Sequence, residues 1–354
     1  MQSSLLLFVT IAFLQCFGSD AARSHPTLRA VTVIFRHGDR LPNDQKGGGL
    51  TNTGRLRSYR FGEKLRKKYG DFLGEFYEPA SIFARSTEYA RAQMSLQLTL
   101  ASLYPPQKHQ KWHKSLNWQP IPYSHAPLNN DVLLYPDGCP RFVQELKAAE
   151  SSAEFKKLLE PFQETMKNLT RLTGSQVSSS RDMFLLYHKF DAMRYMNETL
   201  EDWVYDYFPD GALLNGTYLE YKRLKFTDWL RKINGGALMR KVVDDMTAES
   251  KRAEADGRKL FLYGAHELNI VSVLQTLKLW KPHIPEYSSA VVLELREQLN
   301  LHFVKVLHYQ GIPPVFIEKQ IPGCTTLCPL DKFIKLIEDQ LPSYDEIICS
   351  NERL

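Results

Sequence analysis

Near its beginning the chain carries an almost unbroken run of apolar, largely β-branched residues, from Leu28 to Phe35. A strand of this composition is buried on both faces, so we expect it at the centre of a sheet that helices cover on both sides. The basic stretch Arg36–Arg40, with the sequence RHGDR, follows it directly. Because ligands of open α/β sheets bind beyond the carboxyl ends of the strands, this run predicts a fold class and the position of a site.

Strand and helix patterns alternate towards both ends of the chain. The expected elements are, in order, strand 28–35, helix 51–70, strand 81–84, helix 87–104, strand 259–264, helix 267–279 and strands 290–295 and 301–308. Thr51 or Asn52 can cap the first helix, and Gly70 can end it. The predicted fold class is α/β, with a mixed sheet flanked by helices.

The middle of the chain, 127–258, shows almost no strand pattern. Apolar residues recur there at helical spacing over 141–160, 162–173, 183–207 and 226–255. We therefore predict a helical cap at 127–258, inserted into an α/β domain that is built from 22–126 and 259–354.

Residues 1–21 combine an apolar run, Leu5–Phe13, with the small-residue triplet Ser19-Asp20-Ala21. This arrangement is typical of a secretory signal peptide, although no basic residue precedes the apolar run. A buried N-terminal strand or helix is the alternative interpretation. Since no later stretch has the roughly 18 uninterrupted apolar residues of a membrane span, we expect a secreted protein with no membrane partner.

Three N-x-T sequons, at Asn168, Asn197 and Asn215, predict a glycoprotein. All three fall in the predicted cap, which indicates that this segment has a solvent-exposed face. The formal net charge is +5, and no run of five basic residues occurs. We therefore predict no nucleic-acid partner.

Four cysteines lie outside the predicted signal peptide, and in an oxidising compartment they should pair. Three connectivities are open to them. A local Cys324–Cys328 bridge is sterically easy, and it would leave Cys139 to pair with Cys349. A zinc site is the rival interpretation, but Cys-x3-Cys without a nearby histidine does not favour it.

Three predicted strands end in residues suited to binding an anion. Arg36, His37 and Arg40 follow the first strand, Arg85 ends the second, and His266 with Glu267 follows strand 259–264. Arginine side chains match phosphate oxygens in pairs, and a histidine beside them is a candidate nucleophile at phosphorus. The alternative is three unrelated turns, each with a chance basic residue.

The stretch Leu28–Pro42, LRAVTVIFRHGDRLP, resembles the signature of the histidine acid phosphatase family. The similarity continues through Leu50-Thr51-x-x-Gly54, Arg85-Ser86-Thr87 and Ala265-His266, and the four cysteines suit the secreted, prostatic, lysosomal and venom acid phosphatase-like branch. The resemblance covers essentially the whole chain after the predicted signal peptide. It implies an α/β domain with a helical cap, which agrees with the pattern of elements.

The resemblance also implies roles for single residues. His37 would be the nucleophile that becomes phosphohistidine, and His266 would donate a hydrogen bond to the phosphoryl group. The three arginines, Arg36, Arg40 and Arg85, would bind the non-bridging phosphate oxygens. Glu267 would protonate the leaving oxygen. No metal and no cofactor is implied, because the arginines would supply the positive charge that phosphoryl transfer needs.

One position departs from the family pattern, since Glu267 stands where secreted acid phosphatases have aspartate. The extra methylene moves the carboxyl by roughly an ångström, and misplacement on that scale can cost about 10²-fold in rate. The hypothesis is a secreted acid phosphatase that hydrolyses phosphate monoesters. The alternatives are a catalytically weak or inactive phosphatase-like protein that binds small molecules in the same cleft, a mutase-like transferase, and a phytase-type enzyme.

Other histidines receive a structural interpretation. His109 and His113 flank Lys111-Trp112 and suit a surface turn, and His188 suits a packed or cleft-lining position in the cap. Asp39 receives no role. The expected partner is a small phosphomonoester; a homodimer is compatible with the sequence, which does not set the oligomeric state.

Overall fold

A computed structural model describes residues 26–252, 257–347 and 349 of the chain. The predicted signal peptide, 1–21, lies outside the described residues. The strands within these ranges are β1 (Thr27–Arg36), β2 (Ile82–Ser86), β3 (Ser124–His125), β4 (Leu260–Ala265), β5 (Ala290–Gln298), β6 (Leu301–Tyr309), β7 (Phe316–Lys319) and β8 (Leu327–Pro329).

The strands form one mixed sheet in the order β3-β2-β4-β1-β5-β6-β7, with β8 pairing on β6. Strands β3, β2, β4 and β1 are parallel, whereas β5, β6 and β7 run antiparallel to their neighbours. The predicted fold class is confirmed. The apolar run expected at the centre is strand β1, which pairs with β4 on one side and β5 on the other.

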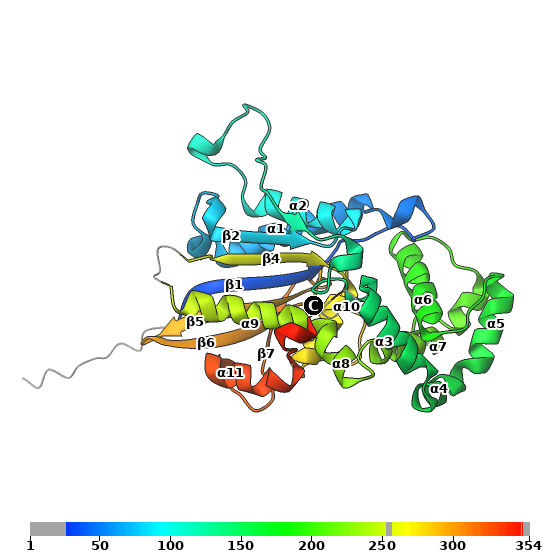
Figure 1. Cartoon of the computed structure of the whole chain (residues 1–354). Coiled ribbons are helices and arrows are strands. Elements are labelled where there is room, and N and C mark those ends of the chain that lie inside the picture. Colours follow the sequence, from blue (N-terminus) through cyan, green and yellow to red (C-terminus); the bar gives the residue numbers. More distant parts are fainter. Residues whose placement is uncertain (1–25, 253–256, 348, 350–354) are drawn as a thin grey trace, which may run out of the picture.

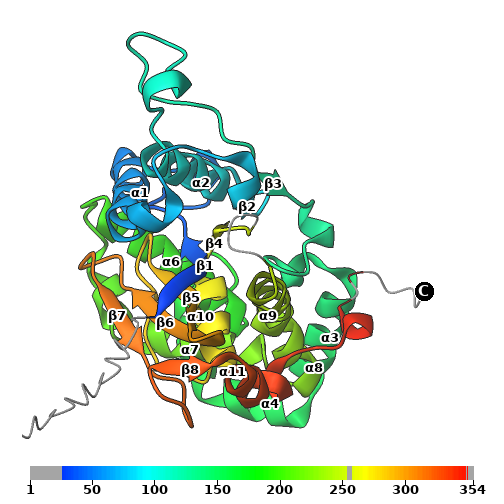
Figure 2. The ribbon, with the colours of Figure 1, turned by 90° about the vertical axis from the view of Figure 1, so that its left-hand side faces the viewer.

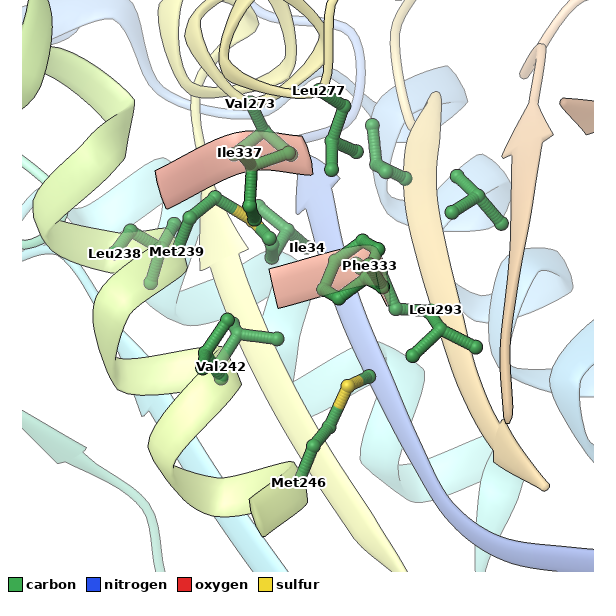
Figure 3. Packing of buried hydrophobic residues seen from close by; sticks show 14 of the residues in the cluster. Ile34, Leu238, Met239, Val242, Met246, Val273, Leu277, Leu293, Phe333 and Ile337 are labelled. Carbon is green, nitrogen blue, oxygen red and sulfur yellow. The ribbon is translucent and has the colours of Figure 1, made fainter. Parts of the chain in front are cut away.

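Helices cover both faces of the sheet (Figures 1 and 2). On one face lie α1 (Asn52–Leu73) and α2 (Ala90–Leu103), and on the other lie α9 (Ala237–Ser250), α10 (Glu267–Thr276) and α11 (Leu330–Ile337). Side chains of β1 alternate between the two cores: Val31 and Val33 pack towards α1 and α2, while Ala30 and Ile34 pack towards α9 and α10. Figure 3 shows Ile34 among the residues of the second core. This burial on both faces explains why the strand has no polar alternation.

The remaining helices gather beyond the carboxyl end of β1 (Figure 1). They are α3 (Pro140–Ser151), α4 (Ala153–Leu159), α5 (Gln163–Thr173), α6 (Ser180–Tyr195), α7 (Ala212–Arg223) and α8 (Asp228–Arg231). Helices α6 and α7 pack on each other around an apolar cluster of their own, which includes Met183, Tyr187 and Leu213. This group of helices covers one end of the sheet, and we call it the cap.

Helix α9 lies inside the range that the sequence predicts as the cap. The range 127–258 includes α9, but Leu238, Val242 and Met246 of this helix pack on the sheet beside Ile34 and Phe261 (Figure 3). Helix α9 therefore belongs to the layer that covers the sheet. Helical spacing of apolar residues cannot distinguish these two positions, because both surfaces that α9 could cover are apolar.

Several predicted helix bounds are also wrong. The first helix passes through Gly70 and ends at Gly74, whose φ of +84° favours glycine. The predicted helix 141–160 divides at Ser152, whose side chain caps α4. The predicted helix 183–207 ends early, after Tyr195, and helix α7 was not predicted. Local capping groups rather than the apolar pattern decide these ends.

Both predicted disulfides are present in the structure. Cys324 pairs with Cys328, and Cys139 pairs with Cys349 across 210 positions of sequence. The second bridge joins the start of α3 to the last described residue of the chain. No helix in the described ranges has both the length and the apolar composition that a bilayer crossing requires.

The sequon asparagines lie on or near α5, α6 and α7. The side chains of Asn197 and Asn215 are exposed, and that of Asn168 is partly exposed. Exposure permits a glycan at these positions, and glycosylation stays a prediction.

Candidate active site

A cavity of about 320 Å³ lies between the carboxyl ends of the parallel strands and the cap helices. Its wall combines side chains from the loop after β1, from α2 and α10, and from α6. The titratable or cationic groups among them are His37, Arg40, Arg91, Asp137, Arg181, His188, His266 and Glu267. The cavity thus joins the sheet edge predicted from the strand ends to a cap surface that the sequence did not predict.

The ring of His37 is fixed in one tautomer. Its Nδ1 lies 2.8 Å from the carbonyl oxygen of Gly38, and a carbonyl can only accept, so Nδ1 carries the proton. The other nitrogen, Nε2, accepts a hydrogen bond from Arg91 Nε at 3.2 Å. Burial, together with Arg91, His266 and Arg36, holds the pKa of His37 well below its usual value. The ring is therefore neutral, and its Nε2 lone pair faces a cation.

His266 stands beside it as a hydrogen-bond donor. The two rings meet edge to face, with 5.4 Å between their centroids. As the N-cap of α10, the His266 ring accepts a hydrogen bond from the backbone N–H of Asn269, and its Nε2 lies 2.9 Å from Thr87 Oγ1. Burial and the nearby Arg91 lower the pKa of His266 to about 3. The neutral ring then carries its proton on Nε2, the nitrogen that points away from the helix.

The cationic part of the wall comes from Arg40 and Arg91. Arg40 is buried in the loop after β1, where its Nη1 donates to the carbonyl of Leu41. Arg91 lies in the first turn of α2, with its guanidinium carbon 4.4 Å from the centre of the Tyr89 ring. Burial and Arg40 lower the pKa of Arg91 to about 10, so it is protonated at neutral and acidic pH.

The structure does not bring Arg85 to this cluster. Arg85 Nη2 lies 2.6 Å from Asp131 Oδ1, and Asp131 is fully buried. The same carboxylate oxygen accepts from the backbone N–H of Leu134, in the segment that leads into the cap. Burial raises the pKa of Asp131 although Arg85 opposes the effect. Arg85 therefore neutralises a buried carboxylate, whereas Arg91, six positions later, lines the cavity.

Arg36 also differs from the expectation, since neither it nor Arg85 lines the cavity in the described ranges. The Arg36 guanidinium lies 3.9 Å above the Tyr287 ring and donates to the carbonyl of Pro285. It lines a separate, smaller cavity with Asp191 and Glu286. Arg36 still acts on the site electrostatically, because it contributes to the low pKa of both His37 and Glu267.

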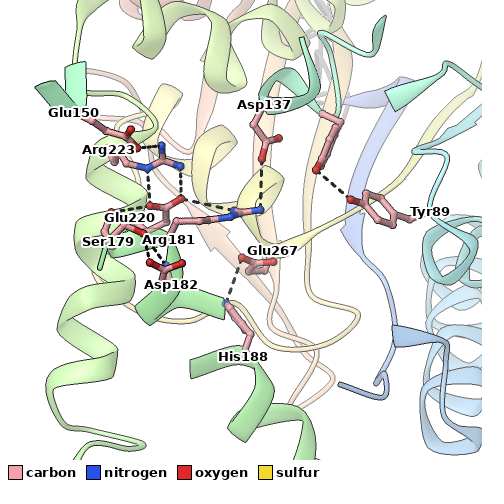
Figure 4. A network of polar contacts seen from close by, with 12 residues as sticks. Tyr89, Asp137, Glu150, Ser179, Arg181, Asp182, His188, Glu220, Arg223 and Glu267 are labelled. Atoms are coloured by element: carbon pink, nitrogen blue, oxygen red, sulfur yellow. Dashed lines mark hydrogen bonds and ion pairs between the residues drawn. The ribbon is translucent and has the colours of Figure 1, made fainter. Parts of the chain in front are cut away.

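Glu267 enters the cavity from the first turn of α10, with only 7% of its surface exposed. Its Oε1 lies 3.4 Å from Nε2 of His188, which comes from α6 (Figure 4). Burial opposes ionisation of Glu267, but His188, Arg36 and His266 outweigh it and hold its pKa well below the usual value. The carboxyl thus lies where the sheet edge and the cap meet.

The loop that carries His37 is packed directly on the start of α1. A Cβ on Gly38 would lie 2.2 Å from the carbonyl oxygen of Gly54, so no larger residue fits without a shift. Asp39, which received no role from the sequence, is buried and accepts two hydrogen bonds from Arg57, at 2.6 and 3.1 Å. These contacts fix the backbone that directly follows His37.

Arg181 of α6 faces the cavity from the cap (Figure 4). Its guanidinium lies between two carboxylates, 3.8 Å from Asp137 and 3.7 Å from Glu220. Glu220 also pairs with Arg223, which reaches Glu150. The cap wall is therefore close to electrically balanced, whereas the sheet edge carries the positive charge.

The sequence predicted four of the cavity residues, namely His37, Arg40, His266 and Glu267, and gave His188 a packed or cleft-lining position in the cap. It did not identify Arg91, Asp137 or Arg181. The position of Arg91 in the first turn after a strand end is a signal that could have identified it. No local pattern distinguishes His188 from a packed cap residue, because its place depends on how α6 lies against α10.

Comparisons with known proteins agree with this geometry. The family model of the histidine phosphatase superfamily, branch 2, matches residues 44–309. Venom acid phosphatase Acph-1 of Apis mellifera is 39% identical over 339 residues, covering 91% of this chain and 87% of the relative. Prostatic acid phosphatase of Homo sapiens is 31% identical over 359 residues, covering 93% and 90%.

A solved structure shares the fold at much lower identity. The phytase from Citrobacter braakii superposes with a TM-score of 0.66 at 16% identity, covering 92% of this chain and all of the other. The family-model match and the two curated relatives extend over most of the chain. The chain is therefore a member of the histidine phosphatase superfamily, branch 2.

Proposed function

We propose that this enzyme hydrolyses phosphate monoesters in two steps, through a phosphohistidine on Nε2 of His37. The observation that carries the proposal is the neutral His37 ring, whose unprotonated nitrogen faces Arg91 inside a cavity that also holds His266 and Glu267. The names of the curated relatives, venom and prostatic acid phosphatase, support the same reaction.

Substrate binding follows from the charges of the wall. A phosphoryl group that approaches Nε2 would replace the hydrogen bond from Arg91, which leaves this guanidinium free to bind the phosphate oxygens. Arg40 and the Nε2–H of His266 would donate the other hydrogen bonds to the phosphate oxygens. We propose Arg91 in the role that the sequence assigned to Arg85, and a supporting electrostatic role for Arg36. Fixed cations of this kind stabilise the transition state of phosphoryl transfer without reorganising.

In the first step the bond between phosphorus and the ester oxygen breaks as the bond to Nε2 forms. The leaving oxygen takes the electron pair and a proton from Glu267, and Gly38 stabilises the charged ring by accepting from Nδ1–H. In the second step a water oxygen bonds to phosphorus as the bond from phosphorus to His37 Nε2 breaks, and the water gives a proton back to Glu267. Inorganic phosphate and neutral His37 result, so the protons balance over the cycle.

The depressed pKa of His37 suits acidic conditions. A histidine with the ordinary value near 6.5 would be mostly protonated, and so not nucleophilic, at pH 5. Burial among cations keeps the ring neutral as the pH falls, while lower pH favours protonated Glu267. A bound phosphate dianion adds negative charge beside Glu267 and raises the pKa of its carboxyl.

The role of Glu267 as the proton donor gives a testable difference between substrates. In Glu267→Gln, formation of the phosphoenzyme from an alkyl phosphate should slow by about 10²-fold or more, because an alkoxide is a poor leaving group. Phosphoenzyme formation from 4-nitrophenyl phosphate, whose phenolate leaves without a proton, should slow much less. Rapid-quench kinetics with both substrates, with and without chelator, measure the two rates; equal slowing would count against this role.

We further propose that the protein works outside the cytosol. Its two disulfides suit an oxidising compartment. The apolar run near the beginning of the sequence suits export. Detection of the protein, free of its first residues, in the medium of expressing cells would test this.

A further inference from the structure

Glu267 has a partner that its own sequence neighbourhood does not supply. The carboxyl is one methylene longer than the aspartate expected at this position, and it reaches towards α6 rather than only towards the sheet edge (Figure 4). The atom it reaches is Nε2 of His188, 3.4 Å from Oε1. Within the described residues neither atom has a hydrogen-bond partner of good geometry, so the contact between them is the close approach of an imidazole and a carboxylate.

The packing of α6 holds the His188 ring in place. The ring lies on the buried face of the helix, one turn from Phe184 and one turn from Asp191, and only 3% of its surface is exposed. The Phe184 and Tyr187 rings contact it edge to face, with centroids 4.5 and 5.5 Å away. Since the ring cannot turn to solvent, Nε2 stays directed at Glu267.

The charges around the pair favour one shared proton. The groups that act electrostatically on Glu267 come from β1, α2, α7 and the start of α10, and they are Arg36, Arg91, Tyr221 and His266. From α6 itself comes His188; Asp191, one turn further on, pairs with Arg194 and acts on Arg36. Two of these groups, Arg36 and Arg91, are cations that stabilise a carboxylate, and the His188 imidazole is the group that contacts this carboxylate directly.

From this geometry we infer that His188 is a positioning residue for Glu267, which holds the longer carboxyl in place and stores the proton that Glu267 gives to the leaving oxygen. The inference rests on the proposed function, because it assumes that Glu267 is the proton donor. Burial opposes ionisation of Glu267, and among the groups that favour its carboxylate form His188 comes first, ahead of Arg36 and His266.

The proton balance of the pair is simple. Before the reaction one proton is shared between His188 Nε2 and Glu267. As the bond from phosphorus to the ester oxygen breaks, that oxygen takes this one proton from Glu267, which leaves a carboxylate beside a neutral His188 ring. When water later attacks the phosphohistidine, its proton returns to the pair.

The pair predicts a particular pH dependence. The enzyme can protonate the leaving oxygen as long as the His188–Glu267 pair holds one proton, and it loses this ability when the pH rises far enough to remove that proton. That macroscopic step lies at a higher pH than the loss of a proton from a lone Glu267, because the proton can also reside on the imidazole. Removal of His188 should therefore move the high-pH limb of the profile to lower pH.

The test compares His188→Gln with wild type, since glutamine can hydrogen-bond the carboxyl but cannot store a proton. For an alkyl phosphate, kcat/KM on the high-pH limb should fall about tenfold or more and the limb should shift to lower pH. For 4-nitrophenyl phosphate at low pH, the change should be less than about twofold. His308→Gln is the matched control, because His308 is also buried but does not line the cavity; its profile should match wild type.

An unshifted limb with both substrates slowed equally in His188→Gln would overturn the inference. If this variant does not fold, ¹⁵N NMR of the imidazoles in the wild-type protein is the deciding measurement. The inference predicts a doubly protonated His188 at the pH of activity. A neutral His188 ring at that pH would overturn it. Phosphate trapped on His37 in wild type separates the two proposals. Without it the proposed function fails, whereas trapping together with an unshifted limb means that only the role of His188 fails.

Discussion

Replacement of His37 by alanine is expected to lower kcat for any phosphate monoester by about 10⁴-fold or more, because no other nucleophile faces the phosphorus in the proposed mechanism. Acid-labile radioactive phosphate should be trapped on wild-type protein during turnover and should be absent from His37→Ala. The substitution also removes the hydrogen bond between the ring and Gly38, but the contacts of Asp39 with Arg57 remain, so the loop should keep its fold.

A matched control for this experiment is His308→Ala, which removes another buried imidazole outside the cavity. It should keep both the phosphoenzyme and the rate. Phosphate trapped on a residue other than His37, or turnover by His37→Ala close to wild type, would contradict the phosphohistidine mechanism.

The second large effect separates two arginines that are close in sequence. Arg91→Ala should lower kcat/KM by about 10²- to 10³-fold and weaken inhibition by inorganic phosphate, because it removes a fixed cation from the phosphoryl group. Arg85→Ala should instead leave a buried Asp131 carboxylate unpaired, which costs about 3–5 kcal/mol in the free energy of unfolding. Steady-state kinetics and urea unfolding of both variants measure the two effects.

The double variant Arg85→Gln with Asp131→Asn sharpens this comparison. It removes both charges together, so stability should largely return while kcat/KM stays close to wild type. If instead phosphate inhibition weakens in the double variant as much as in Arg91→Ala, then Arg85 binds phosphate and the assignment to Arg91 is wrong.

Much of the molecule could be predicted from local pattern. Strand β1 is predictable because burial on both faces requires an unbroken apolar run, and His37, Arg40 and Glu267 are predictable because they directly follow strand ends. The side chain of Arg85 lies away from the predicted position for a physical reason. This residue ends a strand at the correct edge, but its long side chain turns to Asp131, whose position depends on the segment that enters the cap.

The cap was less predictable, because its residues meet the site only through tertiary packing. His188 follows from how α6 lies against α10, and α9 follows from which of two apolar surfaces the helix covers. Apolar spacing gives the buried face of a helix but not its neighbour. The same limit applies to Arg36, whose side chain lies over Tyr287 rather than in the cavity.

The uncharged imidazole of His266 links the fold to acidity. Its pKa is about 3 in the folded chain, against about 6.5 for an unfolded histidine. As the pH falls below about 6.5, the unfolded chain gains a proton that the folded chain does not accept, and each pH unit then lowers the free energy of unfolding by about 1.4 kcal/mol until the folded pKa is reached. His37 acts in the same direction. The acidification that supplies the reaction with protons therefore also lowers the free energy of unfolding. A bound anion raises the pKa of these rings in the folded chain and so opposes this decrease.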